Sequence, residues 1–201
     1  MKLICIGRNY AAHAREMRSE APTEPVFFMK PDTALLKEKD FYFPSFTHDL
    51  HHEIELVLKI SKPGKHIEEK FAHKYYNEIG LGIDFTARDI QAQCKKAGLP
   101  WEKAKAFDNS APVGSFVSKT ELDLNSIAFS LKVNGEERQT GNSADMLFSF
   151  DRIISYVSQF VTLKTGDLIF TGTPEGVGPV NIGDELDGFL NGKRALNLRV
   201  K

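Results

Sequence analysis

The stretch HHEIELVLKI, residues 51–60, determines how the rest of the chain is interpreted. From Glu53 to Ile60 apolar residues occupy every second position, which is typical of a β-strand with one face in the core. Glu53 and Glu55 therefore point to the same face, with their Cβ atoms about 6–7 Å apart. They are either two solvated strand residues or a pair that shares a hard cation such as Mg²⁺. The strand alone leaves both interpretations open.

A third acidic residue, Asp84, lies near the end of the apolar segment EIGLGIDF, residues 78–85. The end of a strand directly before a helix is a place where sheets present functional groups to a crevice. An aspartate there is also favoured simply by the helix dipole. Thr86 and Asp89 resemble a capping box, which predicts a helix over residues 87–97.

The remaining pattern predicts a β-rich α+β fold with a few peripheral helices. Asn134-Gly135 and Asn191-Gly192 are typical of type I′ hairpin turns. We expect an amphipathic helix over about residues 150–160 and a mostly polar helix over residues 67–78. The length of 201 residues suits a single domain over 1–201.

The N-terminal part predicts a helix over about residues 9–19 that carries His13 and Glu16 three positions apart. Such a pair shares one face, where it is either an acid/base pair or a solvated surface pair. Lys30 and Lys105 each lie beside apolar residues, where a lysine either offsets negative charge or extends to the surface.

The loop TGTPEGVG, residues 171–178, is rich in glycine and contains Thr173. Its backbone N–H groups and hydroxyl suit the binding of a carboxylate, and a tight turn is the simpler interpretation. The loop lacks the Gly-Lys-Ser/Thr ending of a nucleotide-binding P-loop.

Charge and composition exclude several classes of function. With 26 basic and 27 acidic residues the formal net charge is −1, and no basic cluster stands out, which argues against a nucleic-acid-binding protein. No segment approaches the roughly 20 apolar residues of a membrane span. Cys5 and Cys94 lie far apart in no metal-binding spacing, as expected in a reducing compartment. We therefore expect a cytoplasmic protein with small-molecule partners, and neither nucleic acid nor membrane.

The order of several motifs along the chain resembles the fumarylacetoacetate hydrolase family, and most closely its single-domain acylpyruvase and oxaloacetate decarboxylase branch. These motifs are GRNYAAHAREM, EPVFFMKP, HHEIELVL, IGLGIDFTARDIQ, LPWEKAKAFDNSAP, NGEERQTGN and TGTPEGVG. The resemblance implies a mixed β-roll of the family's C-terminal domain type, with the helix near residues 9–19 as a lid. It also implies a homodimer and a bacterial-type cytoplasmic enzyme.

The resemblance further implies a role for each candidate residue. Three carboxylates would bind Mg²⁺, with Mn²⁺ or Ca²⁺ as substitutes, while two lid residues would activate water beside an active-site lysine. Four others would hold the carboxylate and oxo groups of a 2-oxo acid substrate. The three carboxylates are Glu53, Glu55 and Asp84. The two lid residues are His13 and Glu16, and the active-site lysine is Lys105. The residues that would hold the substrate are Arg8, Lys30, Gln91 and Thr173.

The activity implied is a Mg²⁺-dependent hydrolysis of the C–C bond of 3-acylpyruvates to pyruvate and a carboxylic acid. Oxaloacetate decarboxylation would pass through the same pyruvate enolate. Isomerisation or tautomerisation of oxo-dicarboxylic acids, as for 2-hydroxyhepta-2,4-diene-1,7-dioate, is the alternative. A non-catalytic metal-binding scaffold is the hypothesis from a different class.

Overall fold

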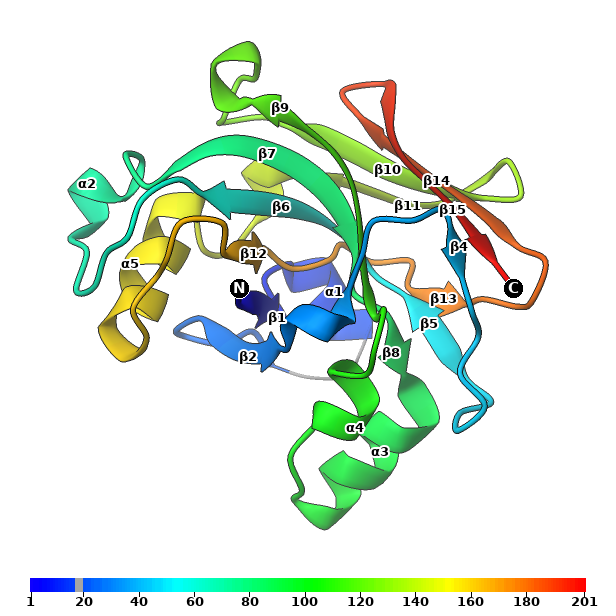
Figure 1. The fold of residues 1–201 in the computed structure, drawn as a ribbon. Helices are drawn as coiled ribbons and strands as arrows, with labels where there is room; N and C mark the ends of the chain where they lie inside the picture. Colours follow the sequence, from blue (N-terminus) through cyan, green and yellow to red (C-terminus); the bar gives the residue numbers. More distant parts are fainter. Residues whose placement is uncertain (17–19) are drawn as a thin grey trace.

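The computed structural model describes residues 1–16 and 20–201, whose strands form three sheets (Figure 1). The seven-stranded sheet contains, in spatial order, β2 (Val26–Lys30), β1 (Leu3–Gly7), β12 (Leu168–Phe170), β6 (Ile54–Ile60), β7 (Tyr76–Ile83), β9 (Ala111–Ser118) and β3 (Leu35–Leu36). Strand β1 pairs parallel with β12, whereas β6, β7 and β9 pair antiparallel. The sheet is therefore mixed, as the β-roll expected from the sequence requires.

The other two sheets contain the C-terminal half and the short strands around residue 50. The five-stranded sheet contains, in spatial order, β11 (Glu136–Asn142), β10 (Ala128–Val133), β14 (Glu185–Leu190), β15 (Lys193–Val200) and β4 (Asp40–Phe41), and the three-stranded sheet contains β13 (Gly178–Pro179), β5 (Leu50–His52) and β8 (Thr86–Ala87). Asn134, Gly135, Asn191 and Gly192 all have positive φ angles, as type I′ turns require. Both predicted hairpins are confirmed.

The helices are few and lie at the periphery. They are α1 (Ala11–Glu16), α2 (Glu69–Ala72), α3 (Arg88–Ala97), α4 (Glu102–Lys105) and α5 (Phe150–Phe160), with short 3₁₀ turns at Asp32–Ala34, Lys119–Glu121 and Ser143–Asp145. Helix α5 has the predicted bounds. The lid helix predicted to start near residue 9 begins at Ala11, and residues 17–19 of that prediction lie outside the described residues.

The helix predicted over residues 67–78 is wrong for most of its length. Only α2 is helical, because Tyr76 already belongs to β7, where its side chain is buried with its ring 6.0 Å from that of Phe150. Burial of this aromatic ring outweighs the helical pattern of the polar residues before it. Among the helices of the described residues, none is long and apolar enough to cross a bilayer.

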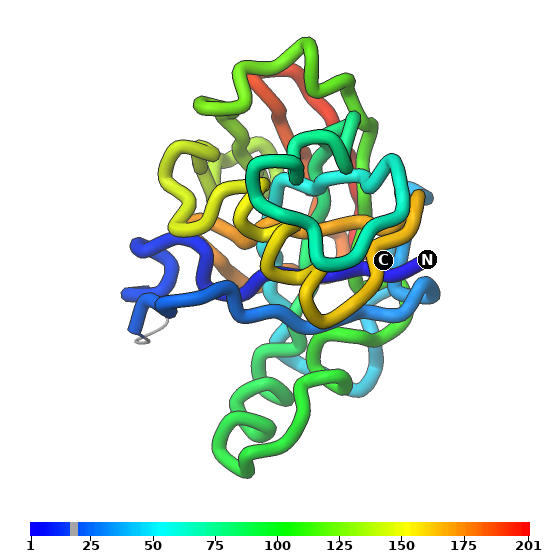
Figure 2. The backbone as a smooth tube through the Cα atoms, turned by 90° about the vertical axis from the view of Figure 1, so that its left-hand side faces the viewer, coloured from blue at the N-terminus to red at the C-terminus, as the bar shows by residue number. Residues whose placement is uncertain are grey.

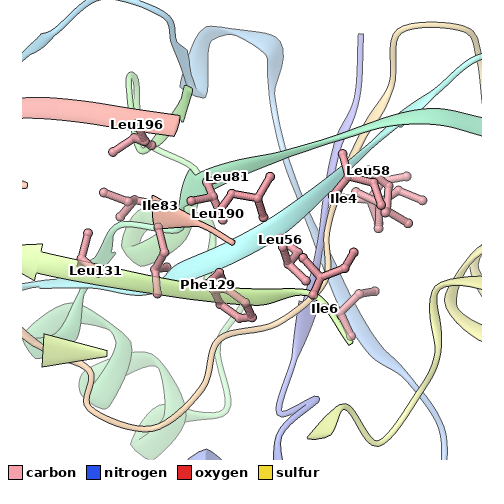
Figure 3. Packing of buried hydrophobic residues seen from close by; sticks show 14 of the residues in the cluster. Ile4, Ile6, Leu56, Leu58, Leu81, Ile83, Phe129, Leu131, Leu190 and Leu196 are labelled. Carbon is pink, nitrogen blue, oxygen red and sulfur yellow. The ribbon is translucent and has the colours of Figure 1, made fainter. Parts of the chain in front are cut away.

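Strand β6 separates two apolar clusters. Leu56 and Leu58 pack on the side of the five-stranded sheet, together with Leu81, Phe129 and Leu131 (Figure 3). Val57, on the other face of the strand, belongs to a second cluster near β1 and β12. Because β6 is buried on both faces from Ile54 to Leu58, a polar side chain within that stretch is removed from water as well. Glu55 is such a side chain, and it is 1% exposed.

Helices α3 and α4 extend together from one end of the sheets (Figures 1 and 2). Helix α3 follows β8 directly and ends at Gly98, whose φ of 64° forms a left-handed C-cap. Its first turn therefore lies close to the ends of β5 and β6, and its last turn lies away from them. This placement brings one face of α3 to the candidate site described below.

Strand β9 approaches β15 closely at Gly114. A Cβ atom added at Gly114 would overlap the carbonyl oxygen of Ala195 in the five-stranded sheet. Only glycine allows the two backbones to come this near, so the contact between the two large sheets depends on it.

We expect Gly114→Ala to lower the free energy of unfolding by about 1–3 kcal/mol, because the methyl group forces β9 and β15 apart. Urea unfolding followed by circular dichroism measures the change. Gly7→Ala is the matched control, since its Cβ atom would meet its nearest neighbour, the oxygen of Val26, at 3.8 Å. Equal stability of the two variants would contradict this account of the sheet contact.

Candidate active site

Three buried carboxylates meet where β6 and β7 pair at one end. Glu53 lies between β5 and β6, Glu55 lies in β6, and Asp84 directly follows β7. The antiparallel register pairs Ile54 with Ile83, and the Asp84 amide donates to the Glu53 carbonyl at 2.8 Å. One oxygen from each carboxylate lies within 4.8 Å of the others. Strand pairing thus adds a third acidic residue to the Glu-x-Glu pair.

Two of these carboxylates have buried cationic partners. Lys105 donates to Glu53 Oε2 at 2.9 Å and to Asp84 Oδ2 at 2.7 Å, and Arg88 lies 2.5 Å from Glu53. Burial opposes the charge of Lys105, but Asp84 and Glu53 outweigh it and raise the pKa of the ammonium to about 12. Burial likewise opposes the charge of Glu53, but Lys105 and Arg88 outweigh it and lower the pKa of that carboxyl.

Glu55 is the carboxylate without a cationic partner among the described residues. It accepts one hydrogen bond, from the Gly172 amide at 2.7 Å. Burial, followed by repulsion from Asp84 and Glu53, raises the pKa of the Glu55 carboxyl well above its ordinary value. An additional positive charge at this point would therefore relieve the repulsion.

Lys30 lies behind Asp84 and does not line the cavity. Its Nζ donates to Phe85 O at 3.3 Å, to Ser110 O at 2.9 Å and to Ser110 Oγ at 3.0 Å, and it forms an ion pair with Asp84 Oδ1 at 2.8 Å. The ammonium is fully enclosed by these partners. Lys30 therefore touches the site through Asp84, with its hydrogen bonds given to Phe85 and Ser110 and its charge paired with Asp84.

The donor set fits a hard divalent cation. Asp84 Oδ1 is buried and accepts no hydrogen bond, although the Lys30 ammonium is near, because the hydrogen bonds of Lys30 go to Phe85 and Ser110. Carboxylate oxygens are the ligands that Mg²⁺, Mn²⁺ and Ca²⁺ prefer. The three carboxylates therefore form a candidate site for a divalent metal ion.

Thr86 serves this site rather than the start of α3. Its hydroxyl donates to Glu53 Oε1 at 3.0 Å, while Asp89 accepts from the Thr47 hydroxyl at 2.6 Å. No side chain caps the helix at Ala87. The predicted capping box is wrong, because the Thr86 hydroxyl donates to the charged Glu53 carboxylate instead of capping the helix.

Helix α1, which the resemblance predicts to be a lid, contacts the loop 171–178. His13 Nδ1 lies 3.1 Å from Glu16 Oε2, and the Gly176 amide donates to Glu16 Oε1 at 3.0 Å. His13 is buried and Glu16 lies at the surface. Glu16 therefore fixes the imidazole and joins α1 to the loop at the same time.

Asn9 anchors the chain just before this helix. Its side chain donates to the carbonyl oxygens of Phe148 and Thr171, at 3.1 and 2.8 Å, and accepts from the Phe148 amide at 2.8 Å. The residue is 0% exposed, so these bonds form away from water. Asn9 thus positions both the lid helix and the loop.

A cavity of about 390 Å³ opens beside the carboxylates. Its wall contains every predicted site residue except Glu16 and Lys30. Glu16 contacts the cavity residue His13, and Lys30 contacts Asp84, so both act through a neighbour. Folding has brought residues from five separate segments of the chain to one hollow.

Sequence patterns did not single out three further cavity residues: Arg88, Lys95 and Trp101. Residues 88, 91 and 95 of α3 are three and four positions apart, which places them on one face of the helix. Because Gln91 was a candidate, this spacing could have identified Arg88 and Lys95 as well.

Comparison with known proteins assigns the chain to a family. The family model described as fumarylacetoacetate (FAA) hydrolase C-terminal matches residues 2–200. The chain belongs to this family. The mouse mitochondrial oxaloacetate tautomerase FAHD1 is 47% identical over an alignment that covers 99% of this chain and 91% of that protein. Oxaloacetate tautomerase YcgM of Escherichia coli is 46% identical, over 99% of this chain and 92% of that protein.

Solved structures of the same family have the same fold. The fumarylpyruvate hydrolase of Pseudomonas aeruginosa, in complex with Mn²⁺ and pyruvate, superposes with a TM-score of 0.94. It is 40% identical, and the alignment covers 100% of this chain and 89% of that one. The family and the fold predicted from the sequence are therefore confirmed.

A buried glutamine in β11, Gln139, supports the candidate site. Gln139 Oε1 lies 2.9 Å from His52 Nδ1 and accepts from the Ile54 amide at 3.1 Å. Its Nε2 donates to the Thr173 hydroxyl at 2.9 Å and to Pro174 O at 3.0 Å. One side chain thus links the start of β6 to the loop, on both sides of the carboxylates.

The Gln139 contact changes what Thr173 can do. The Thr173 hydroxyl donates its proton to Ile54 O at 2.8 Å and accepts from Gln139. The hydroxyl therefore has no proton left to donate to a substrate. Thr173 lines the cavity, and its hydroxyl holds the loop against β6.

We expect Gln139→Leu to lower the free energy of unfolding by about 2–4 kcal/mol, because the buried Ile54 amide and Pro174 carbonyl lose their partner. Urea unfolding tests this, with Gln159→Leu on the exposed side of α5 as the matched control. Unfolding of Gln139→Leu at the same urea concentration as the unsubstituted protein would contradict the supporting role.

Proposed function

We propose that this chain catalyses keto–enol tautomerisation of oxaloacetate-type 2-oxo acids with the help of Mg²⁺. The observation that carries the proposal is the placement of the His13 imidazole. It lines the same cavity as the three carboxylates and Lys105, and Glu16 holds it from behind. The oxaloacetate tautomerases that are 46–47% identical over nearly the whole chain support the same reaction.

Glu53, Glu55 and Asp84 would hold the cation, since their oxygens lie within 4.8 Å of one another and Glu55 lacks a positive partner among the described residues. A bound Mg²⁺ would act as a Lewis acid toward the 2-oxo acid end of the substrate, with Mn²⁺ or Ca²⁺ as substitutes. Arg8 and Gln91, both on the cavity wall, suit the substrate carboxylate at that end.

His13 is the proposed base. Because Nδ1 faces Glu16, we assign the ring proton to Nδ1, which leaves Nε2 free to take a proton from C3 of the keto form. The electron pair of the broken C–H bond moves into the enolate, and the same proton is returned to the C2 oxygen. Lys105, which remains protonated with its pKa of about 12, stabilises the negative charge on that oxygen.

Hydrolysis of 3-acylpyruvates is the second candidate, and the Glu16–His13 pair supports it because such a pair can activate water. In this reaction His13 removes a proton from water, the hydroxide attacks the distal carbonyl, and the C–C bond breaks to release pyruvate enolate and a carboxylic acid. The structural likeness to fumarylpyruvate hydrolase supports this candidate. Decarboxylation of oxaloacetate gives the same enolate without a water molecule.

We expect His13→Gln to lower the rate of enol-to-keto conversion of oxaloacetate by about 10²- to 10⁴-fold, because the proton carrier is lost. The decay of the ultraviolet absorbance of the enol, measured with Mg²⁺ present, gives the rate. His73→Gln at an exposed site is the matched control. An unchanged rate in His13→Gln would remove His13 from the mechanism, and no turnover by the unsubstituted protein would favour a non-catalytic scaffold.

Glu16→Ala separates hydrolysis of acylpyruvates from decarboxylation of oxaloacetate. We expect this change to abolish hydrolysis of acetylpyruvate while sparing decarboxylation of oxaloacetate, which needs no activated water. Pyruvate release, measured with a coupled dehydrogenase assay, follows both reactions, and Glu121→Ala at an exposed position serves as control. Equal retention of both activities in Glu16→Ala would exclude a water-activating role for the pair.

A further inference from the structure

Ser110 is a buried residue directly before β9 that does not line the cavity. It is 0% exposed. The left-handed conformation of Asn109, with a φ of 63°, turns the chain so that Ser110 returns to the end of α4. The Ser110 amide donates to the Phe107 carbonyl at 3.2 Å and closes this turn. Ser110 therefore lies next to Lys105, the last residue of α4.

The side chain of Ser110 bonds to both lysines that flank Asp84. Its hydroxyl lies 2.9 Å from Lys105 O and 3.0 Å from Lys30 Nζ. Because an ammonium can only donate, the hydroxyl accepts from Lys30 and gives its single proton to the Lys105 carbonyl. The Ser110 carbonyl accepts a further bond from Lys30, at 2.9 Å. Ser110 thereby joins Lys30 to the end of α4.

The bond from Ser110 fixes the backbone of Lys105. Helix α4 is a single turn, too short to supply a partner for the carbonyl of its last residue, and the Ser110 hydroxyl is the donor that this carbonyl needs. At the other end of the Lys105 side chain, the ammonium lies between Glu53 and Asp84. Lys105 is thus held at both ends, with its side chain in the cavity wall.

Loss of the Ser110 hydroxyl would disturb both cations beside Asp84. Lys30 pairs with Asp84 Oδ1 at 2.8 Å and Lys105 with Oδ2 at 2.7 Å, so the two ammonium groups occupy different oxygens of one carboxylate. Without the hydroxyl, the buried carbonyl of Lys105 loses its donor and the end of α4 can shift. A displacement of about 1 Å is enough to weaken a catalytic contact.

We propose that Ser110 is a positioning residue that places the Lys105 ammonium where negative charge develops in the reaction. This inference rests on the proposed function, because the charge concerned is that on the C2 oxygen of the substrate enolate. Ser110 touches neither substrate nor cation and acts through Lys105. Its contribution is therefore larger for an enolate than for the ketone from which the enolate forms.

Two matched ligands test this placement without requiring turnover. Oxalate is a planar dianion that resembles the pyruvate enolate in shape and charge, whereas pyruvate has a neutral ketone at C2. Isothermal titration calorimetry in the presence of Mg²⁺ measures the dissociation constant of each ligand for the unsubstituted protein, Ser110→Ala, Lys105→Met and the variant with both changes. Ser115→Ala is the control, because this exposed serine of β9 also donates to a backbone carbonyl, that of Ala195 at 3.2 Å.

We expect Ser110→Ala to weaken oxalate binding by about five- to tenfold and pyruvate binding by less than about twofold, because the charged hydrogen bond from Lys105 becomes misaligned. In the presence of Lys105→Met the same change should have no further effect, since Ser110 acts through that ammonium. An equal effect on both ligands, oxalate binding as tight as in Ser115→Ala, or full additivity with Lys105→Met overturns the inference.

Ser110→Cys takes the place of Ser110→Ala in these measurements if the alanine variant does not fold. The thiol nearly preserves the volume of the side chain and donates only weakly. The same preferential loss of oxalate binding is expected, and the same outcomes overturn the inference.

The rate of oxaloacetate tautomerisation distinguishes failure of this inference from failure of the proposed function. If the unsubstituted protein tautomerises oxaloacetate but Ser110→Ala binds oxalate as tightly as Ser115→Ala does, only the role of Ser110 is wrong. If oxaloacetate is not turned over while Ser110→Ala weakens oxalate binding only when Lys105 is present, the tautomerase proposal is wrong and the placement of Lys105 by Ser110 stands.

Discussion

The site depends on one constraint: the carboxylates of Glu53, Glu55 and Asp84 are buried close together. Like charges this close repel one another, and removal from water makes each ionised form less favourable. The protein compensates Glu53 and Asp84 with buried cations and leaves Glu55 with a single backbone hydrogen bond. All three nearby cations, Lys30, Arg88 and Lys105, pair with Glu53 or Asp84, so among the described residues no positive charge lies against Glu55, and this suits the binding of a divalent ion there.

Much of the surrounding structure serves to hold these groups in place. Gln139 ties the start of β6 to the loop, Asn9 ties the loop to the segment before α1, and Gly172 presents its amide to Glu55. A φ of 102° at Gly172 lets the loop turn toward the carboxylate. Groups that do not line the cavity therefore fix the positions of the residues that do.

Sequence patterns correctly predicted those turns and helices whose conformation depends on residues close by in the chain. Asn134-Gly135 forms its hairpin because the turn itself requires positive φ, and the bounds of α5 follow from its apolar periodicity. The helix expected over residues 67–78 was wrong because Tyr76 is buried against α5, a long-range contact that no window of sequence contains. The resemblance to the family located the carboxylates, whose local pattern alone favoured a solvated pair.

Side-chain partners were harder to predict than elements. The Thr86 hydroxyl donates to Glu53 instead of capping α3, and the Lys30 ammonium pairs with Asp84 and does not line the cavity. In both cases the partner is a charged group that only folding brings near. Gln139 is separated from Ile54 by 85 residues and carries no signal in its own stretch. The homodimer and the cytoplasmic location expected from the sequence remain predictions.

Anomalous diffraction from crystals soaked in Mn²⁺ tests the central claim most directly, because it locates the ion without reference to activity. The electrostatic account predicts a peak enclosed by the oxygens of Glu53, Glu55 and Asp84, and its loss in Glu55→Gln crystals soaked in the same way. A peak elsewhere in the molecule, or no peak while Lys105 still bridges Glu53 and Asp84, would contradict it.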